Sequence, residues 1–107
     1  MHRGAIAVLM LLGIADAASA FTCRLEVGGQ VFLDGGCQYE EDSDGSFRFF
    51  DDGDSRMFVY LNMNGDGTGQ GYWPGPEGGT HAHDNLGILR RDGACWINDE
   101  VAVCAWR

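Results

Sequence analysis

The stretch Arg-Met-Phe-Val-Tyr-Leu-Asn, residues 56–62, decides the fold class of this chain. Its β-branched and aromatic side chains are typical of a β-strand. Because successive side chains of a strand point to opposite faces, Met57, Val59 and Leu61 share one face and two aromatic residues occupy the other. Apolar residues on both faces predict a closed barrel or a packed sandwich, since a sheet with one wet side would alternate apolar with polar residues.

Similar patterns with a period of two cover residues 21–107, and no window has the 3.6-residue apolar repeat of a helix. We therefore predict an all-β fold, a small antiparallel meander. The expected strands are residues 22–27, 30–34, 37–41, 46–50, 56–62, 68–73, 85–91, 94–98 and 101–106. Glycine dipeptides that favour tight turns join many of them, namely Gly28-Gly29, Asp44-Gly45, Asn64-Gly65 and Asp92-Gly93.

Residues 1–20 have the order of a secretory signal peptide, which we expect to form a helix ahead of the β domain. A basic start at His2 and Arg3 precedes an apolar run over 5–14, and Ala18-Ser19-Ala20 matches the usual cleavage site. The apolar run is too short to span a bilayer, which needs about 20 residues. We predict cleavage before Phe21, a periplasmic or extracellular location, and no membrane insertion after cleavage.

Removal of residues 1–20 leaves 107 − 20 = 87 residues, a single small domain at 21–107 that contains all four cysteines. An even cysteine count in a short exported chain predicts two disulfides, and the spacings lack the close pairs of zinc sites. A two-residue turn at Asp99-Glu100 places Cys95 opposite Cys104, within bridging reach.

The second predicted disulfide, Cys23–Cys37, needs an irregularity in the strand pairing. A turn at Gly28-Gly29 places Cys23 opposite Asp34, which is three residues short of Cys37. We expect a bulge or kink at Gly35-Gly36 to close that gap.

The formal net charge is −9, and the chain contains no lysine. Such an acidic surface repels phosphate backbones and anionic membranes, which excludes nucleic acid as an expected partner. A cationic protein or a divalent metal ion is attracted by the same field. The charge is equally consistent with a role in solubility alone.

Two segments carry possible metal ligands. His81 and His83, with Asp84 beside them, point the same way if the segment is extended, and such imidazoles can share zinc or copper; alternatively they hold the loop backbone by hydrogen bonds. The second segment resembles a calcium loop of the EF-hand kind. Its candidate ligands are Glu40, Asp42, Asp44 and Asp51, although Asp44-Gly45 between two strand patterns is also a simple hairpin turn.

Aromatic residues give the better functional lead. Tyr72 and Trp73 precede the long loop 74–84, and together with Trp96 and Trp106 they form either an exposed patch for a sugar or protein, or part of the core. We expect the ligand-binding residues to be Tyr72, Trp73, His81, His83 and Asp84. The loop is the longest connection, and long loops are often functional.

Catalysis has little support in the sequence, because the serines lie in acidic turns and solvated carboxylates lack the raised pKa of a general acid. We therefore expect a non-catalytic exported binding protein for a protein or glycan, with no cofactor beyond a possible divalent metal ion. A metal-binding module and a small secreted hydrolase are the alternatives. The layout of signal peptide, small disulfide-bonded β domain and acidic face resembles the periplasmic inhibitors of lysozyme, from which no residue roles carry over because no inhibitory loop motif matches.

Overall fold

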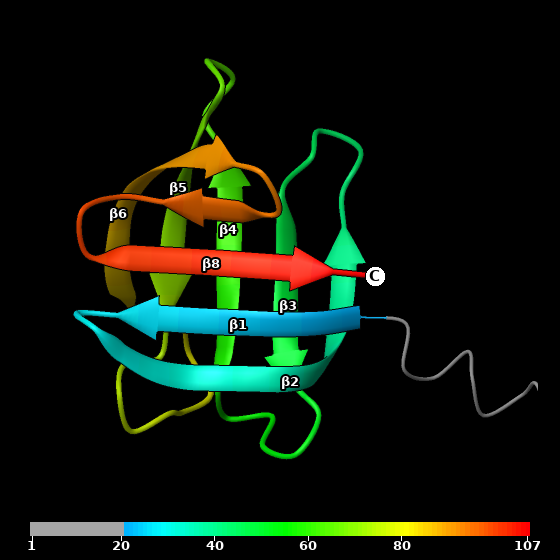
Figure 1. Ribbon diagram of the computed structural model, residues 1–107, viewed down its shortest axis with the longest axis vertical. Coiled ribbons are helices and arrows are strands. Elements are labelled where there is room, and N and C mark those ends of the chain that lie inside the picture. The colour runs from blue at the N-terminus through cyan, green and yellow to red at the C-terminus, as the bar shows by residue number, and fades with distance from the viewer. Residues whose placement is uncertain (1–20) are drawn as a thin grey trace, which may run out of the picture.

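The computed structural model describes residues 21–107, in which eight antiparallel strands form one closed barrel (Figure 1). The strands are β1 (Phe21–Val27), β2 (Gln30–Glu41), β3 (Phe47–Asp51), β4 (Phe58–Met63), β5 (Thr68–Trp73), β6 (Asp84–Asp92), β7 (Cys95–Ile97) and β8 (Val101–Trp106). The predicted all-β fold is confirmed, and the barrel is the form it takes. The predicted signal peptide, residues 1–20, lies outside the described residues.

The barrel closes because β1 pairs with both β2 and β8. Its closing register runs from Thr22 opposite Trp106 to Val27 opposite Val101, so β8 ends beside the start of β1. In Figure 1, β1 and β8 run side by side across the front of β3, β4 and β5, almost at right angles to them. The two layers enclose the core between them.

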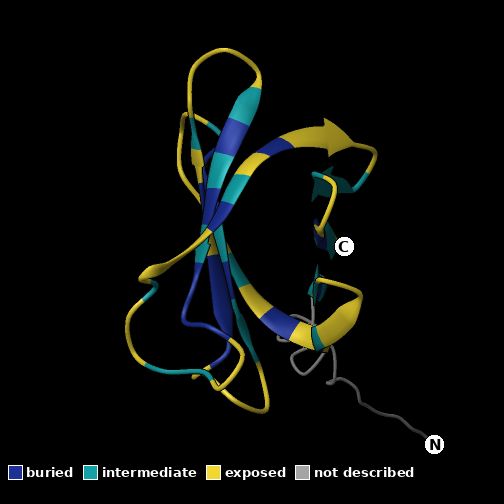
Figure 2. Cartoon of the chain, turned by 90° about the vertical axis from the view of Figure 1, so that its left-hand side faces the viewer, coloured by how far each residue is buried: buried dark blue, intermediate teal, exposed yellow. Residues whose placement is uncertain are grey.

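Alternation of side chains along each strand fills the barrel interior. Leu25, Phe49, Val59 and Leu61 are fully buried there, and Figure 2 shows the buried segments along the strands and the exposed turns at their ends. The residues between them face outward, where Phe50 stacks on Phe58 with ring centroids 5.1 Å apart. Apolar residues on both faces therefore serve two separate clusters, one inside and one outside.

Two glycines of β5 make room for the leucines of neighbouring strands. A Cβ atom at Gly69 would lie 3.0 Å from Leu61 Cγ, and one at Gly71 would lie 3.0 Å from Leu89 Cδ1 and 3.1 Å from Leu86 Cβ. Real Cβ atoms rarely approach so closely in a core packed to crystal density. The glycines of β5 thus allow the close packing of Leu61, Leu86 and Leu89.

We predict that Gly71→Val lowers the free energy of unfolding by about 1–3 kcal/mol, because the added atoms overfill the barrel beneath two leucines. Chemical denaturation followed by circular dichroism measures the loss. Gln70→Val, on the opposite face of the same strand, is the matched control and costs much less. Equal losses of unfolding free energy in the two variants would show that a side chain at position 71 does not overfill the core.

The first disulfide, Cys23–Cys37, is confirmed, with a Cα–Cα distance of 5.8 Å. The expected irregularity lies elsewhere than predicted. Leu25 pairs with Leu33 and Glu26 pairs with Val31, so the intervening residue of β2 is a bulge and Cys23 lies opposite Gly35.

A second correction concerns β2 itself, which was expected as two strands over 30–34 and 37–41. It continues as one strand through Gly35 and Gly36. Gly35 has a φ of +148°, a conformation that favours glycine, and the strand bends around the barrel there while keeping its pairing. The glycine pair is therefore a bend within a strand and not a turn between two.

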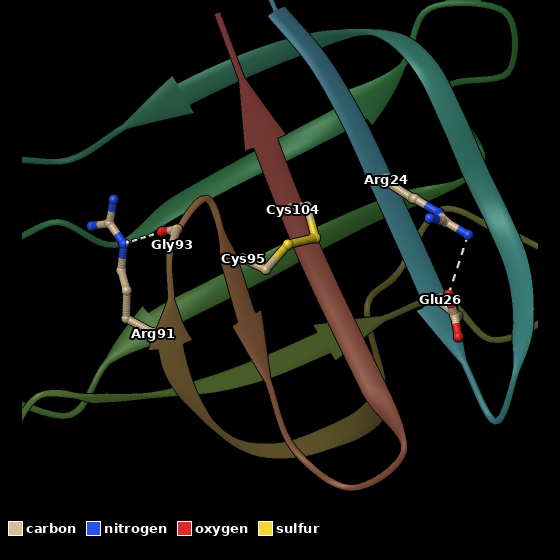
Figure 3. Close-up of a disulfide and its surroundings, with 6 residues drawn as sticks. All are labelled: Arg24, Glu26, Arg91, Gly93, Cys95 and Cys104. Atoms are coloured by element: carbon tan, nitrogen blue, oxygen red, sulfur yellow. Dashed lines mark hydrogen bonds and ion pairs between the residues drawn. A yellow bond between two sulfur atoms is a disulfide. The ribbon is translucent and has the colours of Figure 1, made fainter.

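The second disulfide, Cys95–Cys104, joins directly opposed residues of β7 and β8, as predicted (Figure 3).

The turn at 98–101 also shields β6 beyond the end of short β7. Asn98 Nδ2 donates to the carbonyl oxygens of Leu86 at 3.0 Å and of Ile88 at 3.3 Å. Its Oδ1 accepts hydrogen bonds from the backbone N–H groups of Glu100 and Val101, both at 2.9 Å.

Two disulfides in a small all-β domain are typical of secreted or periplasmic proteins, since thiols stay reduced in most cytosols. Among residues 21–107, no helix has the length and apolar character needed to cross a membrane.

Candidate functional site

Three turns meet at one end of the barrel, which we call the mouth. They join β2 to β3, β4 to β5 and β6 to β7, and the start of β1 and the end of β8 lie at the same end (Figure 1). A cavity of about 260 Å³ opens there, which we call the mouth pocket. Its principal side chains are Tyr39, Glu41, Phe47, Met63, Arg91 and Trp96.

The mouth pocket lies just beyond the end of the core, where the inward faces of several strands continue past the last fully packed residues. Four of its side chains lie two positions from a core residue of the same strand, and therefore on the same face. These pairs are Cys37 and Tyr39 in β2, Phe49 and Phe47 in β3, Leu61 and Met63 in β4, and Leu89 and Arg91 in β6. The sequence period that builds the core thus also directs these side chains into the pocket.

Aromatic rings form one wall of the pocket. Phe21 stacks on Tyr39 with ring centroids 4.3 Å apart, and Tyr39 stacks on Phe47 at 5.3 Å. The row continues into the core, where Phe47 lies 6.2 Å from Phe49. Because its inner end is buried and packed, the wall is a rigid surface suited to a flat or cyclic ligand.

Arg91 lines the pocket and brings a positive charge to it. Its Nε donates to the carbonyl oxygen of Gly93 at 3.0 Å, and its guanidinium carbon lies 5.9 Å from the centre of the Trp96 ring. Unlike Arg24 and Arg48, which pair with Glu26 at 3.3 Å and with Glu40 at 2.8 Å, Arg91 has no carboxylate within 4.0 Å in the described chain. Its terminal nitrogens, directed away from Gly93, remain available to a ligand.

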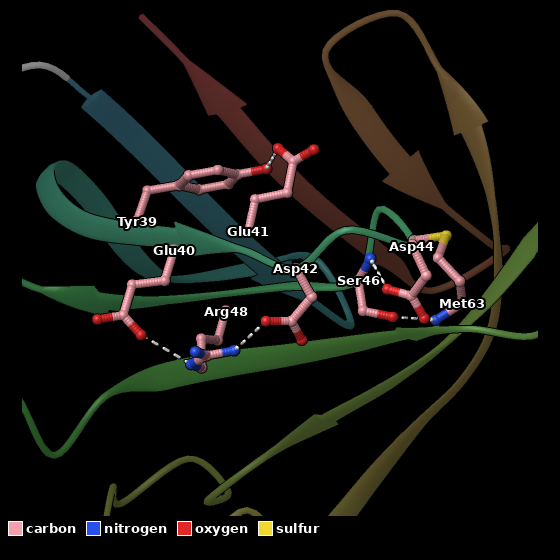
Figure 4. Close-up of polar contacts among 8 residues, drawn as sticks. All are labelled: Tyr39, Glu40, Glu41, Asp42, Asp44, Ser46, Arg48 and Met63. Atoms are coloured by element: carbon pink, nitrogen blue, oxygen red, sulfur yellow. Dashed lines mark hydrogen bonds and ion pairs between the residues drawn. The ribbon is translucent and has the colours of Figure 1, made fainter.

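Glu41 brings the opposite charge. The hydroxyl of Tyr39 donates to Glu41 Oε1 at 2.9 Å (Figure 4). Burial, together with this hydrogen bond and the negative charge of Glu41, raises the pKa of Tyr39 to about 12. The phenol therefore stays protonated at neutral pH, and it holds the Glu41 carboxylate in one orientation beside the pocket.

The acidic segment that resembles a calcium loop forms the turn between β2 and β3. Glu40 lies opposite Arg48 and binds it at 2.8 Å, and Asp42 contacts the same arginine at 3.4 Å. Asp51 lies opposite Cys37, at the far end of the paired strands from the turn. The hairpin interpretation is confirmed, and the geometry does not bring Asp51 to Glu40 or Asp42.

Asp44 has a structural role in that turn. Its Oδ1 accepts a hydrogen bond from the backbone N–H of Ser46 at 2.8 Å, which lowers the pKa of the Asp44 carboxyl (Figure 4). The hydroxyl of Ser46 accepts in turn from the backbone N–H of Met63, at 2.8 Å. These two bonds join the β2–β3 turn to the end of β4 and shape one side of the mouth.

The other predicted binding residues lie at the opposite end of the barrel from the mouth. Trp73 is only 6% exposed and packs edge-on against Phe32, with ring centroids 4.9 Å apart. It belongs to the core, because position 73 shares the inward face of β5 with Gly69 and Gly71. The alternative that placed Trp73 in an exposed patch is therefore corrected. Tyr72 faces outward, opposite Tyr60.

The histidines occupy the exposed loop between β5 and β6. His83 Nε2 lies 3.6 Å from Asp84 Oδ1, and His81 Nδ1 lies 3.1 Å from the hydroxyl of Thr80. Within residues 21–107, no three His, Cys, Asp or Glu side chains stand close enough to hold a metal ion together. The predicted metal site therefore has two neighbouring groups, His83 and Asp84, and no third from the described chain.

Sequence reasoning named Trp96 as an aromatic candidate and missed the rest of the mouth pocket. A signal for Arg91 was present in the predicted strand 85–91, where Arg91 is in phase with the apolar Leu89. A charged residue on the core side of a strand must lie at an open end or be paired, because burying an unpaired charge is costly.

No family model, curated protein or solved structure matches this chain.

Proposed function

We propose that this protein is an exported, non-catalytic binding protein of the periplasm or the extracellular medium, and that its ligand occupies the mouth pocket. One observation carries the proposal: an aromatic-walled cavity of about 260 Å³ contains an anchored arginine that pairs with no carboxylate of the described chain. A concave apolar site with a few fixed polar groups is the usual form of a ligand site.

The chemistry of the pocket favours binding over catalysis. Its principal side chains offer no serine, cysteine or histidine, and all four cysteines of the protein are in disulfides. The Tyr39 phenol, with a pKa of about 12, is a poor base near neutral pH. Tyr39, Glu41 and Arg91 therefore act as hydrogen-bonding groups that orient a ligand.

Between the two expected ligand classes, a cationic protein and a glycan, the pocket favours the glycan. A cavity of this size accommodates a single sugar ring, for which the aromatic wall and Trp96 provide stacking surfaces. Glu41 and the terminal nitrogens of Arg91 offer hydrogen bonds to ring substituents. A cationic ligand could pair with Glu41 but would meet the positive charge of Arg91 in the same cavity.

We predict that the exported form binds one or more members of an oligosaccharide array, and that Trp96→Ala weakens the binding by about 2 kcal/mol, or roughly thirtyfold, as expected for an aromatic hot spot. Calorimetry on the best array member measures the change.

The matched control is Trp106→Ala, which removes a tryptophan that is 41% exposed and does not line the pocket. It should leave the affinity unchanged. Absence of saccharide binding, or an equal loss in both tryptophan variants, would refute the proposed function.

A further inference from the structure

The position of Arg91 indicates that the ligand carries a negative charge. Guanidinium groups only donate hydrogen bonds, and they bind planar two-oxygen anions best. The bond from Arg91 Nε to Gly93 fixes the side chain, and both terminal nitrogens face away from that contact (Figure 3). Arg56, Arg90 and Arg107 also have no carboxylate of the described chain within 4.0 Å, but of these four arginines only Arg91 lines the mouth pocket, where it can meet an anion from outside.

A second arginine strengthens the positive charge at the mouth. The guanidinium carbon of Arg107 lies 4.6 Å from the centre of the Phe21 ring, and Phe21 stacks on Tyr39 of the pocket wall. At physiological ionic strength, charges more than about 8 Å apart are largely screened in water. Carboxylates lie at the mouth as well, Glu41 in the pocket and Asp44, Asp66 and Asp92 at the three turns, so an anion is attracted by direct contact with Arg91 and not by the net charge of the mouth.

Glu41 indicates what else the ligand carries. Its carboxylate accepts one hydrogen bond from Tyr39, and its remaining acceptor positions border the same cavity as Arg91. A ligand that presented only an apolar ring and a carboxylate would offer these acceptor positions no hydrogen-bond donor. Hydroxyl groups on the ring supply the missing donors, because a hydroxyl can donate to Glu41 while the ligand carboxylate binds Arg91.

From this arrangement we infer that the mouth pocket recognises an acidic sugar unit, a pyranose ring that carries a carboxylate. The ring stacks against the aromatic wall, the carboxylate binds the terminal nitrogens of Arg91, and a hydroxyl donates to Glu41. This inference rests on the proposed function, and it narrows the glycan to one chemical class.

The test uses three soluble probes that share a six-membered ring: glucuronate, glucose and cyclohexanecarboxylate. Each is titrated into the exported protein while the indole N–H signal of Trp96 is followed by NMR. Because charge-assisted hydrogen bonds are stronger than neutral ones, we expect glucuronate to bind about tenfold more tightly than glucose. Cyclohexanecarboxylate should also bind more weakly than glucuronate, since it has no hydroxyl for Glu41.

Arg91→Gln should remove the preference for glucuronate over glucose, because a neutral amide cannot form the charge-assisted pair with the ligand carboxylate. Arg90→Gln is the matched control, because Arg90 is the adjacent arginine on the other face of β6 and does not line the pocket. It should preserve the preference.

Three results would overturn the inference: equal affinity for glucose and glucuronate, an equal or higher affinity for cyclohexanecarboxylate, or no shift of the Trp96 signal with glucuronate up to about 10 mM, the millimolar range of weak binding. If a neutral saccharide still shifts the Trp96 signal, the proposed function stands and only the acidic class is wrong. If no saccharide shifts it and none binds in the array experiment, both are wrong.

Discussion

Replacement of both Cys23 and Cys37 by alanine is expected to lower the free energy of unfolding by about 3 kcal/mol through the lost constraint on the unfolded chain. The two cysteines are 14 residues apart in sequence, and their side chains are 0% and 3% exposed, so the variant also loses buried sulfur contacts. Folded domains are stable by only about 5–15 kcal/mol, and small ones lie near the lower limit. The loss is therefore a large fraction of the total.

Urea unfolding of the oxidised protein, followed by circular dichroism, measures this change. The variant that replaces Cys95 and Cys104 is the comparison, because that bridge links residues already opposed in a hairpin and only nine apart. It should cost slightly less. A Cys23/Cys37 variant within about 0.5 kcal/mol of the parent, the usual range for neutral surface changes, would contradict the stabilising role of the bridge.

Phe49→Ala is expected to cost about 3–5 kcal/mol, the usual range for removing a large aromatic side chain from a packed core. The side chain is fully buried in the core cluster and stacks on Phe47, so its removal leaves a cavity that the surrounding residues fill only in part. The same unfolding experiment measures it.

Phe50→Ala gives a matched control from the adjacent residue. Phe50 is half-buried on the outer face, where it contacts Phe58 and Tyr60, and its removal should cost clearly less because solvent can occupy the space. Equal costs for the two variants would mean that positions 49 and 50 do not alternate between inside and outside.

Local geometry explains why much of the fold was predictable. A two-residue turn fixes the pairing of its strands, so the Asp99-Glu100 turn was enough to place Cys95 opposite Cys104. The irregularity near Cys23 was misplaced because the bulge at residue 32 belongs to the curvature of the whole barrel. Gly35-Gly36 has the composition of a turn, and only the pairing with β1 and β3 shows that the strand continues through it.

The candidate site was less predictable because its residues come from distant parts of the sequence. Alternation shows that Tyr39, Phe47 and Arg91 face inward, but it does not show which end of the barrel stays open or that these residues meet there. Trp73 illustrates the same difficulty. Its place at a strand end beside a long loop suggested a binding surface, whereas its phase with Gly69 and Gly71 places it in the core.

The hydrogen bonds of Asn98 to Leu86 and Ile88 affect how this protein can associate. Every strand from β1 to β8 has a partner on both sides, and Asn98 occupies two carbonyl groups of β6 that short β7 leaves uncovered. Backbone paired on one side only remains in the first half of β2, which pairs with β1 alone, and in the first half of β6, so the two Asn98 bonds remove part of the edge on which another chain could add a strand. Asn98 thus limits strand addition at the side of β6 that short β7 leaves open.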